Sequence, residues 1–393
     1  MAHYCVPIRT ALVGYSQSNQ SLQQDRHKHS VKSEESVTQG HSSPVRGRGA
    51  QSNPAHRFQT QELQSDLTEG IDEQAEIDSP TQFLEDYPKK VINRVDSPDI
   101  GMSWSVNPYQ GCEHGCIYCY ARNTHPYWGY SAGLDFERKI VVKPQVADLV
   151  EKAFQKPNWE PMPLMLSGNT DCYQPAERKY KLTRKILEVC LRYRHPVGII
   201  TKNALVLRDI DLLRELASMN LLRVNLSITT LNEGLRRKLE PRTVPGKRRL
   251  QVVEKLSAQG IPVHVMAAPM IPGLNSEEIP EILRSAADAG ALSCAYILVR
   301  LNGEVAGLFE EWLGQQFPER KDKVLSLIRQ CRGGNLSEHR FGIRMRGEGP
   351  VALSIKALFQ SAWRQHFQDR VMPPFDTSRF VRRSGEQLGL FGS

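Results

Sequence analysis

Residues 111–122 read GCEHGCIYCYAR and place three cysteines within eight residues of one another. Cys112, Cys116 and Cys119 follow the spacing C-x3-C-x2-C on a glycine-rich stretch. Zinc normally takes four ligands, often from paired C-x2-C motifs, so a zinc site here would need a fourth ligand such as His114. An iron–sulfur cluster with four irons could instead use the three thiolates alone and leave one iron open. The stretch therefore indicates a metal centre, and the three-ligand spacing favours iron–sulfur over zinc.

The composition is that of an ordinary globular protein with a basic balance. The 393 residues carry a formal net charge of +8, with 40% hydrophobic and 24% charged residues. No apolar run approaches the ~20 residues of a membrane helix, and the first residues, MAHYCVPIRTALVGY, lack the apolar core of a secretory signal. We therefore expect a cytoplasmic protein with no membrane partner. The positive charge suits nucleic acid but does not by itself indicate it.

The N-terminal part of the chain is strongly polar. Residues 16–82 contain a single aromatic, Phe58, among many Gln, Ser, Glu, Asp and His residues. Such a stretch buries too little apolar surface to offset its ordering entropy, so we predict a largely disordered tail over residues 1–85. Within it, PVRGRGAQSNPAHRF (44–58) is interpreted either as solvated tail or as a segment that clips onto the folded domain or onto a polyanion.

From Val91 onward, short apolar runs alternate with amphipathic helical stretches. The runs that we predict as strands are 139–142, 162–168, 197–202, 222–229, 263–270 and 294–300. The predicted helices between them are 176–194, 209–219, 245–260 and 276–290. This alternation favours parallel strands joined by helices. We predict an α/β fold, a partial (β/α)6 TIM-like barrel over residues 86–303, with its working residues at the C-terminal ends of the strands.

The residues after the predicted barrel look helical. Stretches 304–316, 319–331 and 351–370 predict a mostly helical C-terminal extension over residues 304–380. A flexible tail over residues 381–393 follows.

The cysteine motif resembles that of a known superfamily. C-x3-C-x2-C with an aromatic directly before the last cysteine, here Tyr118, is the signature of the radical S-adenosylmethionine (SAM) superfamily. The resemblance implies that Cys112, Cys116 and Cys119 hold a 4Fe-4S cluster whose open iron is chelated by SAM. One electron, from a cellular donor such as a flavodoxin or ferredoxin, would then cleave SAM to methionine and a 5′-deoxyadenosyl radical. The radical would abstract hydrogen from a substrate, while the protein orients the substrate and excludes water.

The resemblance continues over about residues 98–300. The strings NPYQGCEHGCIYCYAR, SGNTDCYQPAERKYKLTR and VNLSITTLNEGLRRKLEPRTVPGKRR are similar to the branch that contains spore photoproduct lyase and uncharacterised bacterial relatives. The branch implies cofactor contacts from residues that mostly end strands, namely Asn169, Thr170, Asp171, Lys202, Ser227 and Arg242. From the residues alone, Asp171 has an alternative interpretation as a cap of the helix that starts near Pro175, and Lys202 has one as a solvated side chain. Lys247, Arg248 and Arg249 are interpreted as a solvated helix face, with a phosphate-contacting role as the alternative.

Two tyrosines and one cysteine are the predicted catalytic residues. Tyr118 and Tyr120 flank Cys119, as a tyrosine pair does in the lyases, where they lie by the substrate and one relays the radical. A packing role competes for Tyr118. The lyases also carry a cysteine hydrogen donor before the strand-end motif, but the matching position here is Gly168. The nearest thiol, Cys172, is the candidate donor, and this departure separates the chain from the lyases themselves.

The last residues contain a possible docking peptide, QLGLF (387–391). It resembles the motif by which bacterial DNA repair and replication proteins bind the sliding clamp. Gln387 would hydrogen-bond the rim of an apolar groove that Leu388, Leu390 and Phe391 fill. Together, these features predict a radical SAM enzyme acting on DNA or a nucleobase as a repair-like lyase. The alternatives are the same chemistry on RNA, a protein or a small molecule, and a non-catalytic metal-binding nucleic-acid adaptor.

Overall fold

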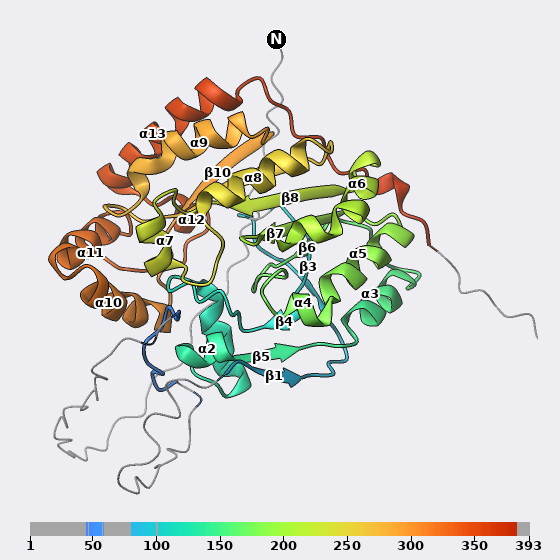
Figure 1. The fold of residues 1–393 in the computed structure, drawn as a ribbon, viewed down its shortest axis with the longest axis horizontal. Coiled ribbons are helices and arrows are strands. Elements are labelled where there is room, and N and C mark those ends of the chain that lie inside the picture. The colour runs from blue at the N-terminus through green and yellow to red at the C-terminus, as the bar shows by residue number, and fades with distance from the viewer. Residues whose placement is uncertain (1–44, 46, 57, 59–79, 100, 383–393) are drawn as a thin grey trace, which may run out of the picture. The chain divides into compact units, whose positions relative to one another are not determined.

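A seven-stranded sheet forms the centre of the structure (Figure 1). The computed structural model describes residues 45, 47–56, 58, 80–99 and 101–382. The sheet order is β10-β9-β8-β7-β6-β3-β2, and all neighbouring pairs are parallel except β2 and β3. The strands are β2 (Ile92–Arg94), β3 (Trp104–Val106), β6 (Leu164–Leu166), β7 (Val197–Thr201), β8 (Leu222–Ser227), β9 (Val263–Met270) and β10 (Ser293–Leu298). Six parallel strands in this order confirm the predicted partial barrel.

Helices connect the parallel strands, as the alternating pattern predicted. They are α4 (Glu177–Tyr180), α5 (Leu182–Arg192), η2 (Ala204–Asp209), α6 (Ile210–Ser218), α7 (Glu233–Leu239), α8 (Gly246–Ser257), η3 (Ser276–Glu278) and α9 (Ile279–Asp288). Helix α5 buries Ile186, Leu187 and Cys190, whose spacing puts them on one face. The single helix predicted over 176–194 is two, because Lys181 has φ 53°, the left-handed conformation that ends α4.

The first strand of the barrel differs from the prediction. The apolar run 139–142 is β5 (Lys139–Val142), which pairs with β1 (Gln82–Glu85) and β4 (Tyr109–Gln110) in a separate three-stranded sheet. The barrel begins instead with β3, whose three residues are too few to show a strand period. η1 (Tyr120–Trp128) and α2 (Leu134–Arg138) lie between β4 and β5 in sequence, and α3 (Val146–Phe154) follows β5.

The C-terminal region is helical, as predicted. It contains α10 (Glu304–Gln316), η4 (Pro318–Arg320), α11 (Lys321–Gln330), α12 (Ile343–Arg346), α13 (Gly349–Phe367) and η5 (Thr377–Arg379). Helix α13 packs along α9 on the outside of the barrel (Figure 1). The buried side chains Ala352, Ile355 and Phe359 of α13 join the main apolar core, so the extension is part of the same folded body as the barrel.

Part of the range predicted as tail is ordered on the domain. Residues 47–56 contact the barrel, and residues 82–85 form β1. Of the two interpretations of residues 44–58, docking on the folded domain therefore describes the structure. The remaining predicted tails, residues 1–44, 59–79 and 383–393 with QLGLF (387–391), lie outside the described residues.

Candidate active site

The three cysteines lie on a tightly turned loop that follows the first barrel strand. We call residues 111–119 the cluster loop; it runs from β4 to η1. Gly111 and Gly115 have φ of 77° and 68°, a conformation that favours glycine. A Cβ on Gly111 would lie 2.8 Å from the Lys139 carbonyl oxygen. Backbone conformation and close packing therefore both require glycine at this end of the loop.

The thiols form a buried group of ligands. Cys112 and Cys116 are buried, and Cys119 is partly exposed. Burial raises the pKa of all three, and the nearby thiols raise the pKa of Cys112 further, while burial and Glu240 raise that of Cys116 to about 12. Such thiols lose their protons only to a strongly positive partner, as metal binding provides. Three clustered thiols, two of them buried, fit the ligand set of an iron–sulfur cluster.

The spacing of these ligands also bears on the metal. Among the described residues, no three His, Cys, Asp or Glu side chains converge closely enough to hold a single metal ion. A cluster does not require such convergence, because each of its cysteines binds a different iron. His114, the candidate fourth zinc ligand, instead contacts two other residues: its Nδ1 lies 3.3 Å from Asp171 and its Nε2 lies 3.1 Å from Asn203.

Asp171 ties the cluster loop to the ends of two strands. Besides His114, its carboxylate accepts hydrogen bonds from Thr201 Oγ1 and the Lys202 amide, both at 2.8 Å. Burial opposes the charge, but these contacts hold the pKa of Asp171 below its usual value. The N-cap of α4 is Ala176, so Asp171 does not cap that helix. Its hydrogen bonds position the loop above β6 and β7.

Asn169 and Thr170, the two residues before Asp171, make hydrogen bonds within the protein. Thr170 Oγ1 donates to the Tyr109 carbonyl at 2.6 Å. The Asn169 side chain donates to Thr124 at 3.1 Å. The Arg242 guanidinium lies 3.9 Å from the carboxylate of Glu113 on the cluster loop. All three therefore lie next to the cluster loop or to the segments that support it.

Lys202 points toward the cluster loop rather than into solvent. Its Nζ lies 5.9 Å from the centre of the Tyr118 ring. Burial lowers the pKa of Lys202, but Cys116 and Glu240 raise it more, so it ends above its usual value. A lysine held charged beside the cysteines can bind a carboxylate of a ligand there. Lys202 is partly buried, between the solvated interpretation and a fully enclosed site.

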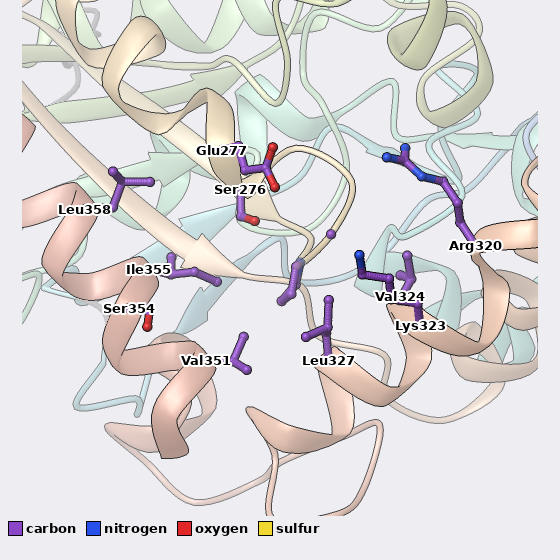
Figure 2. Close-up of a pocket in the computed structure, with 12 residues that line it drawn as sticks. Ser276, Glu277, Arg320, Lys323, Val324, Leu327, Val351, Ser354, Ile355 and Leu358 are labelled. Atoms are coloured by element: carbon purple, nitrogen blue, oxygen red, sulfur yellow. The ribbon is translucent and has the colours of Figure 1, made fainter.

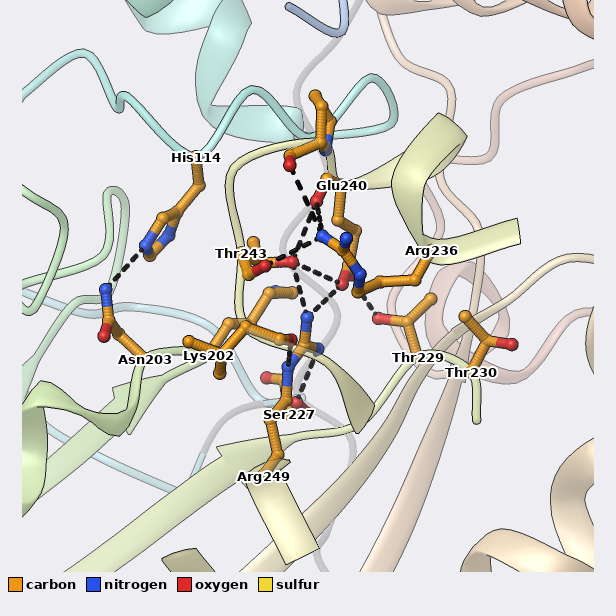
Figure 3. A network of polar contacts seen from close by, with 12 residues as sticks. His114, Lys202, Asn203, Ser227, Thr229, Thr230, Arg236, Glu240, Thr243 and Arg249 are labelled. Carbon is orange, nitrogen blue, oxygen red and sulfur yellow. Dashed lines mark hydrogen bonds and ion pairs between the residues drawn. The ribbon is translucent and has the colours of Figure 1, made fainter. Parts of the chain in front are cut away.

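Glu240 and Arg249 form a buried ion pair near Lys202 (Figure 3). Glu240 pairs with Arg249, and the two side chains are 0% and 1% exposed. Glu240 also accepts hydrogen bonds from Tyr118 and from Thr229, the latter at 2.6 Å. Burial raises the pKa of Glu240, but Arg249 and Lys202 outweigh it and bring the pKa to about 2. The network fixes the Tyr118 ring against the barrel interior.

Arg249 corrects one prediction from the sequence. Residues 247–249 were expected to form a solvated face, yet Arg249 points inward and donates to the Ser227 carbonyl at 3.0 Å. Successive helix positions are about 100° apart, so one of three consecutive basic residues can face the core while Arg248 stays outside. Composition alone could not distinguish the inward residue. Ser227 itself ends β8 and is buried in this network.

Tyr120 and Cys172 lie in contrasting surroundings. The Tyr120 ring is 48% exposed, and its hydroxyl donates to the Gly168 carbonyl at 2.6 Å. Tyr120 therefore reaches the backbone just after β6. Cys172 is fully buried in the main apolar core, where its amide donates to Ser167 Oγ at 2.6 Å. Its role as hydrogen donor stays a prediction.

Two buried charges behind the cluster loop were missed by the sequence analysis. Arg122 donates to the Cys116 carbonyl at 3.0 Å and to Glu137 at 2.5 Å. Both charged side chains are 0% exposed. A buried Arg usually has a carboxylate partner, but no pattern in the sequence links Arg122 to Glu137, which lies beyond η1.

A pocket elsewhere contains none of the predicted site residues. It has a volume of ≈ 480 Å³ and lies between α11, α13 and the segment after β9 (Figure 2). Apolar side chains line its floor, and Arg320, Lys323 and Glu277 lie at its edges. The cluster loop and the strand ends around it, rather than this pocket, form the candidate active site.

A parallel partial barrel with a three-cysteine loop at the C-terminal edge of its strands defines an iron–sulfur enzyme of the barrel class. A family model, the Radical SAM superfamily, matches residues 106–286. An uncharacterized protein of Mycobacterium tuberculosis is 33% identical over 251 residues, which are 63% of this chain and 74% of that protein. One of Methanocaldococcus jannaschii is 29% identical over 243 residues, 62% and 86% of the two chains. The chain belongs to the radical SAM superfamily.

A solved structure shares the fold. Spore photoproduct lyase complexed with dinucleoside spore photoproduct matches with a TM-score of 0.53 and 17% identity, over 73% of this chain and 80% of that one. The protein is thus a radical SAM enzyme that uses a 4Fe-4S cluster and SAM, and enzymes of this class need an electron donor. None of the helices in the described part of the chain has the length and apolar character that crossing a membrane requires.

Proposed function

We propose that the protein uses radical SAM chemistry on DNA or a nucleobase, in a repair-like reaction. The observation that carries the proposal is Tyr120, a half-exposed aromatic ring hydrogen-bonded to Gly168 at the strand ends. Aromatic rings can stack on nucleobases, and guanidinium groups can bind phosphates. The fold likeness to a lyase solved with a dinucleoside lesion supports the same substrate class.

A basic side chain near Tyr120 supplies the second half of such a surface. Arg300 follows β10 and lies close enough to Tyr120 for each side chain to shift the pKa of the other, although burial is the larger effect: it lowers the pKa of Arg300 and raises that of Tyr120 to about 12. The Arg300 Nε is buried and has no hydrogen-bond partner among the described residues. Arg344 lies over Phe341, with 4.2 Å between its guanidinium and the ring centre, but it is paired with Asp99 at 2.5 Å. The Arg300 guanidinium beside the open Tyr120 ring is therefore the group that favours a phosphate-bearing substrate.

The residues around the cluster loop have separate roles in this proposal. Cys112, Cys116 and Cys119 hold the cluster, which when loaded with SAM supplies the 5′-deoxyadenosyl radical. Six residues orient SAM: Asn169, Thr170, Asp171, Lys202, Ser227 and Arg242. Lys202 does so by offering its ammonium group to the SAM carboxylate, and Asp171 by holding the loop. Tyr118 and Tyr120 face the reacting groups, and Cys172 donates hydrogen.

The test is product analysis after anaerobic reconstitution with iron and sulfide. The reduced protein is given SAM with intact or ultraviolet-irradiated DNA, and 5′-deoxyadenosine is measured. We expect 5′-deoxyadenosine from the wild type and none from Cys116→Ala, with stimulation by irradiated DNA. Arg300→Ala should reduce that stimulation, whereas Arg284→Ala, on the exposed face of α9, should not.

Each part of the proposal can fail separately. Formation of 5′-deoxyadenosine that irradiated DNA does not stimulate would refute the DNA substrate and favour RNA, a protein or a small molecule. No 5′-deoxyadenosine from fully loaded, reduced protein would favour the non-catalytic adaptor. The proposed sliding-clamp partner of residues 387–391 is tested by clamp binding of the full chain and of a chain lacking residues 385–393.

A further inference from the structure

A short N-terminal segment covers the outer side of the cluster loop. We call residues 47–56 the strap; in Figure 1 it is part of the blue segment beside α2. The Gly49 and Ala50 amides donate to the two carboxylate oxygens of Glu137, at 3.1 and 2.8 Å. Arg48 donates to the Glu137 carbonyl at 2.8 Å. Three successive strap residues therefore bind one buried glutamate.

The same glutamate leads directly to a cysteine of the cluster loop. Glu137 accepts from Arg122, and Arg122 donates to the Cys116 carbonyl. The strap amides, Glu137, Arg122 and the Cys116 carbonyl thus form one continuous chain of hydrogen bonds. Glu137 and Arg122 are both fully buried, so an amide lost from the strap would leave a buried carboxylate less satisfied.

Packing between the strap and the loop leaves no room for a side chain. A Cβ on Gly49 would lie 1.8 Å from the Gly115 carbonyl oxygen, which is backbone and cannot move aside alone. Ala50 is buried in the same apolar cluster as Cys116, Ile117 and Tyr118. Because the two backbone segments pack this closely, neither segment can move without displacing the other.

The far end of the strap is fastened independently. The Ser52 carbonyl accepts from the Leu134 amide at 3.1 Å, and the Ser52 hydroxyl donates to Glu311 on α10 at 2.8 Å. Asn53 exchanges hydrogen bonds with Asp135, donating to its carboxylate and accepting from its amide. The strap is therefore attached to α2 through Leu134, Asp135 and Glu137 and to α10 through Glu311.

We propose that the strap holds the cluster loop in the conformation that presents its cysteines, and closes its outer side to solvent. Gly49, Arg122 and Glu137 are positioning residues in this arrangement, since they act on the loop and not on a substrate. The inference depends on the cluster-binding role of the cysteines and is independent of what the enzyme acts on. It predicts that a displaced strap exposes the thiols even before a cluster is present.

The test measures alkylation of the cluster-free protein by iodoacetamide, with each cysteine followed by mass spectrometry. In Gly49→Ala, the added methyl group displaces the strap, and Cys116 should react about tenfold faster or more, because alkylation follows the population of open loop. Cys190, buried in the main core, should stay protected. The matched control is Gly307→Ala on α10, where a Cβ would meet nothing within 4 Å, and it should behave as the wild type.

Two further measurements make the outcome decisive. If Cys190 also reacts in Gly49→Ala, the milder Arg48→Ala, which removes the hydrogen bond to the Glu137 carbonyl, takes its place and should speed the reaction of Cys116 severalfold with Cys190 protected. In reconstituted protein, the strap variants should release iron to a chelator faster than Gly307→Ala. Unchanged Cys116 reactivity in Arg48→Ala and Gly49→Ala, with Cys190 protected, would overturn the proposal.

Discussion

Removing the Glu240 carboxylate should destabilise the whole fold more than any surface change. Glu240→Ala leaves the Arg249 guanidinium, 1% exposed, without its charged partner in the barrel interior. Loss of one member of a buried pair typically costs about 3–5 kcal/mol, because the other charge stays desolvated. That is a large fraction of the ~5–15 kcal/mol by which domains are stable. The hydroxyls of Tyr118 and Thr229 lose an acceptor as well.

The assay is urea unfolding of the cluster-free protein, followed by tryptophan fluorescence. The matched control is Glu281→Ala, which breaks a pair with Arg284 whose side chains are 52% and 53% exposed. Solvent screening limits that loss to about 1 kcal/mol or less. The double variant Glu240→Ala/Arg249→Met should recover stability relative to Glu240→Ala, since no unpaired charge remains.

The result that would refute this reasoning is specific. If Glu240→Ala lost no more stability than Glu281→Ala, water or another acidic group would have to compensate Arg249. If the double variant were less stable than Glu240→Ala, the loss would come from packing of the Arg249 side chain rather than from its charge.

Four further predictions concern the site and pH. Cys116→Ala should lose the iron and acid-labile sulfide of the reconstituted wild type, and full loading would contradict its role as a ligand. Tyr120→Phe should keep the cluster but form about tenfold less product, the effect of one lost positioning hydrogen bond; equal turnover would argue against the Tyr120–Gly168 contact. Cys172→Ala should keep 5′-deoxyadenosine formation and lose substrate-derived product, and unchanged product would exclude Cys172 as donor. Burial lowers the pKa of His195 from 6.5 to about 3, so only the unfolded chain binds this proton between those values. The unfolding free energy should therefore fall by about 1.4 kcal/mol per pH unit as pH drops below 6.5, and His195→Gln should remove that part of the slope.

Local sequence patterns predicted most of the barrel correctly. Five of the six predicted strands are parallel barrel strands, because each is a compact apolar run between helices. The predicted helices 245–260 and 276–290 end at Gly260 and Gly290, which have φ of 71° and 93°, as a left-handed cap requires. The run 139–142 was assigned to the wrong sheet, since an apolar strand shows that it is buried but not which neighbour it pairs with.

The candidate site was predicted unevenly for a similar reason. The three cysteines are adjacent in sequence, so their spacing alone identified the ligands and the superfamily. Arg249 was expected on a solvated face, and its burial depends on which way α8 faces the barrel. Glu240, which ends α7, was included only in a string that resembles the lyase branch. Arg122 and Glu137 could not be predicted as a pair, because the two residues of a buried ion pair cannot be distinguished in the sequence from exposed charged residues.

The sequence by itself determined the chemistry that the protein can carry out and the class of its fold. Ligand type and spacing are local properties, and the alternation of strands and helices is a repeated local property. Tertiary structure alone decided that a polar N-terminal stretch covers the cluster loop and that one glutamate joins it to Cys116. The contacts of the N-terminal stretch with Glu137 join residues 87 to 89 positions apart. The free energy that selects them comes from burial and hydrogen bonding that exist only once the chain has folded.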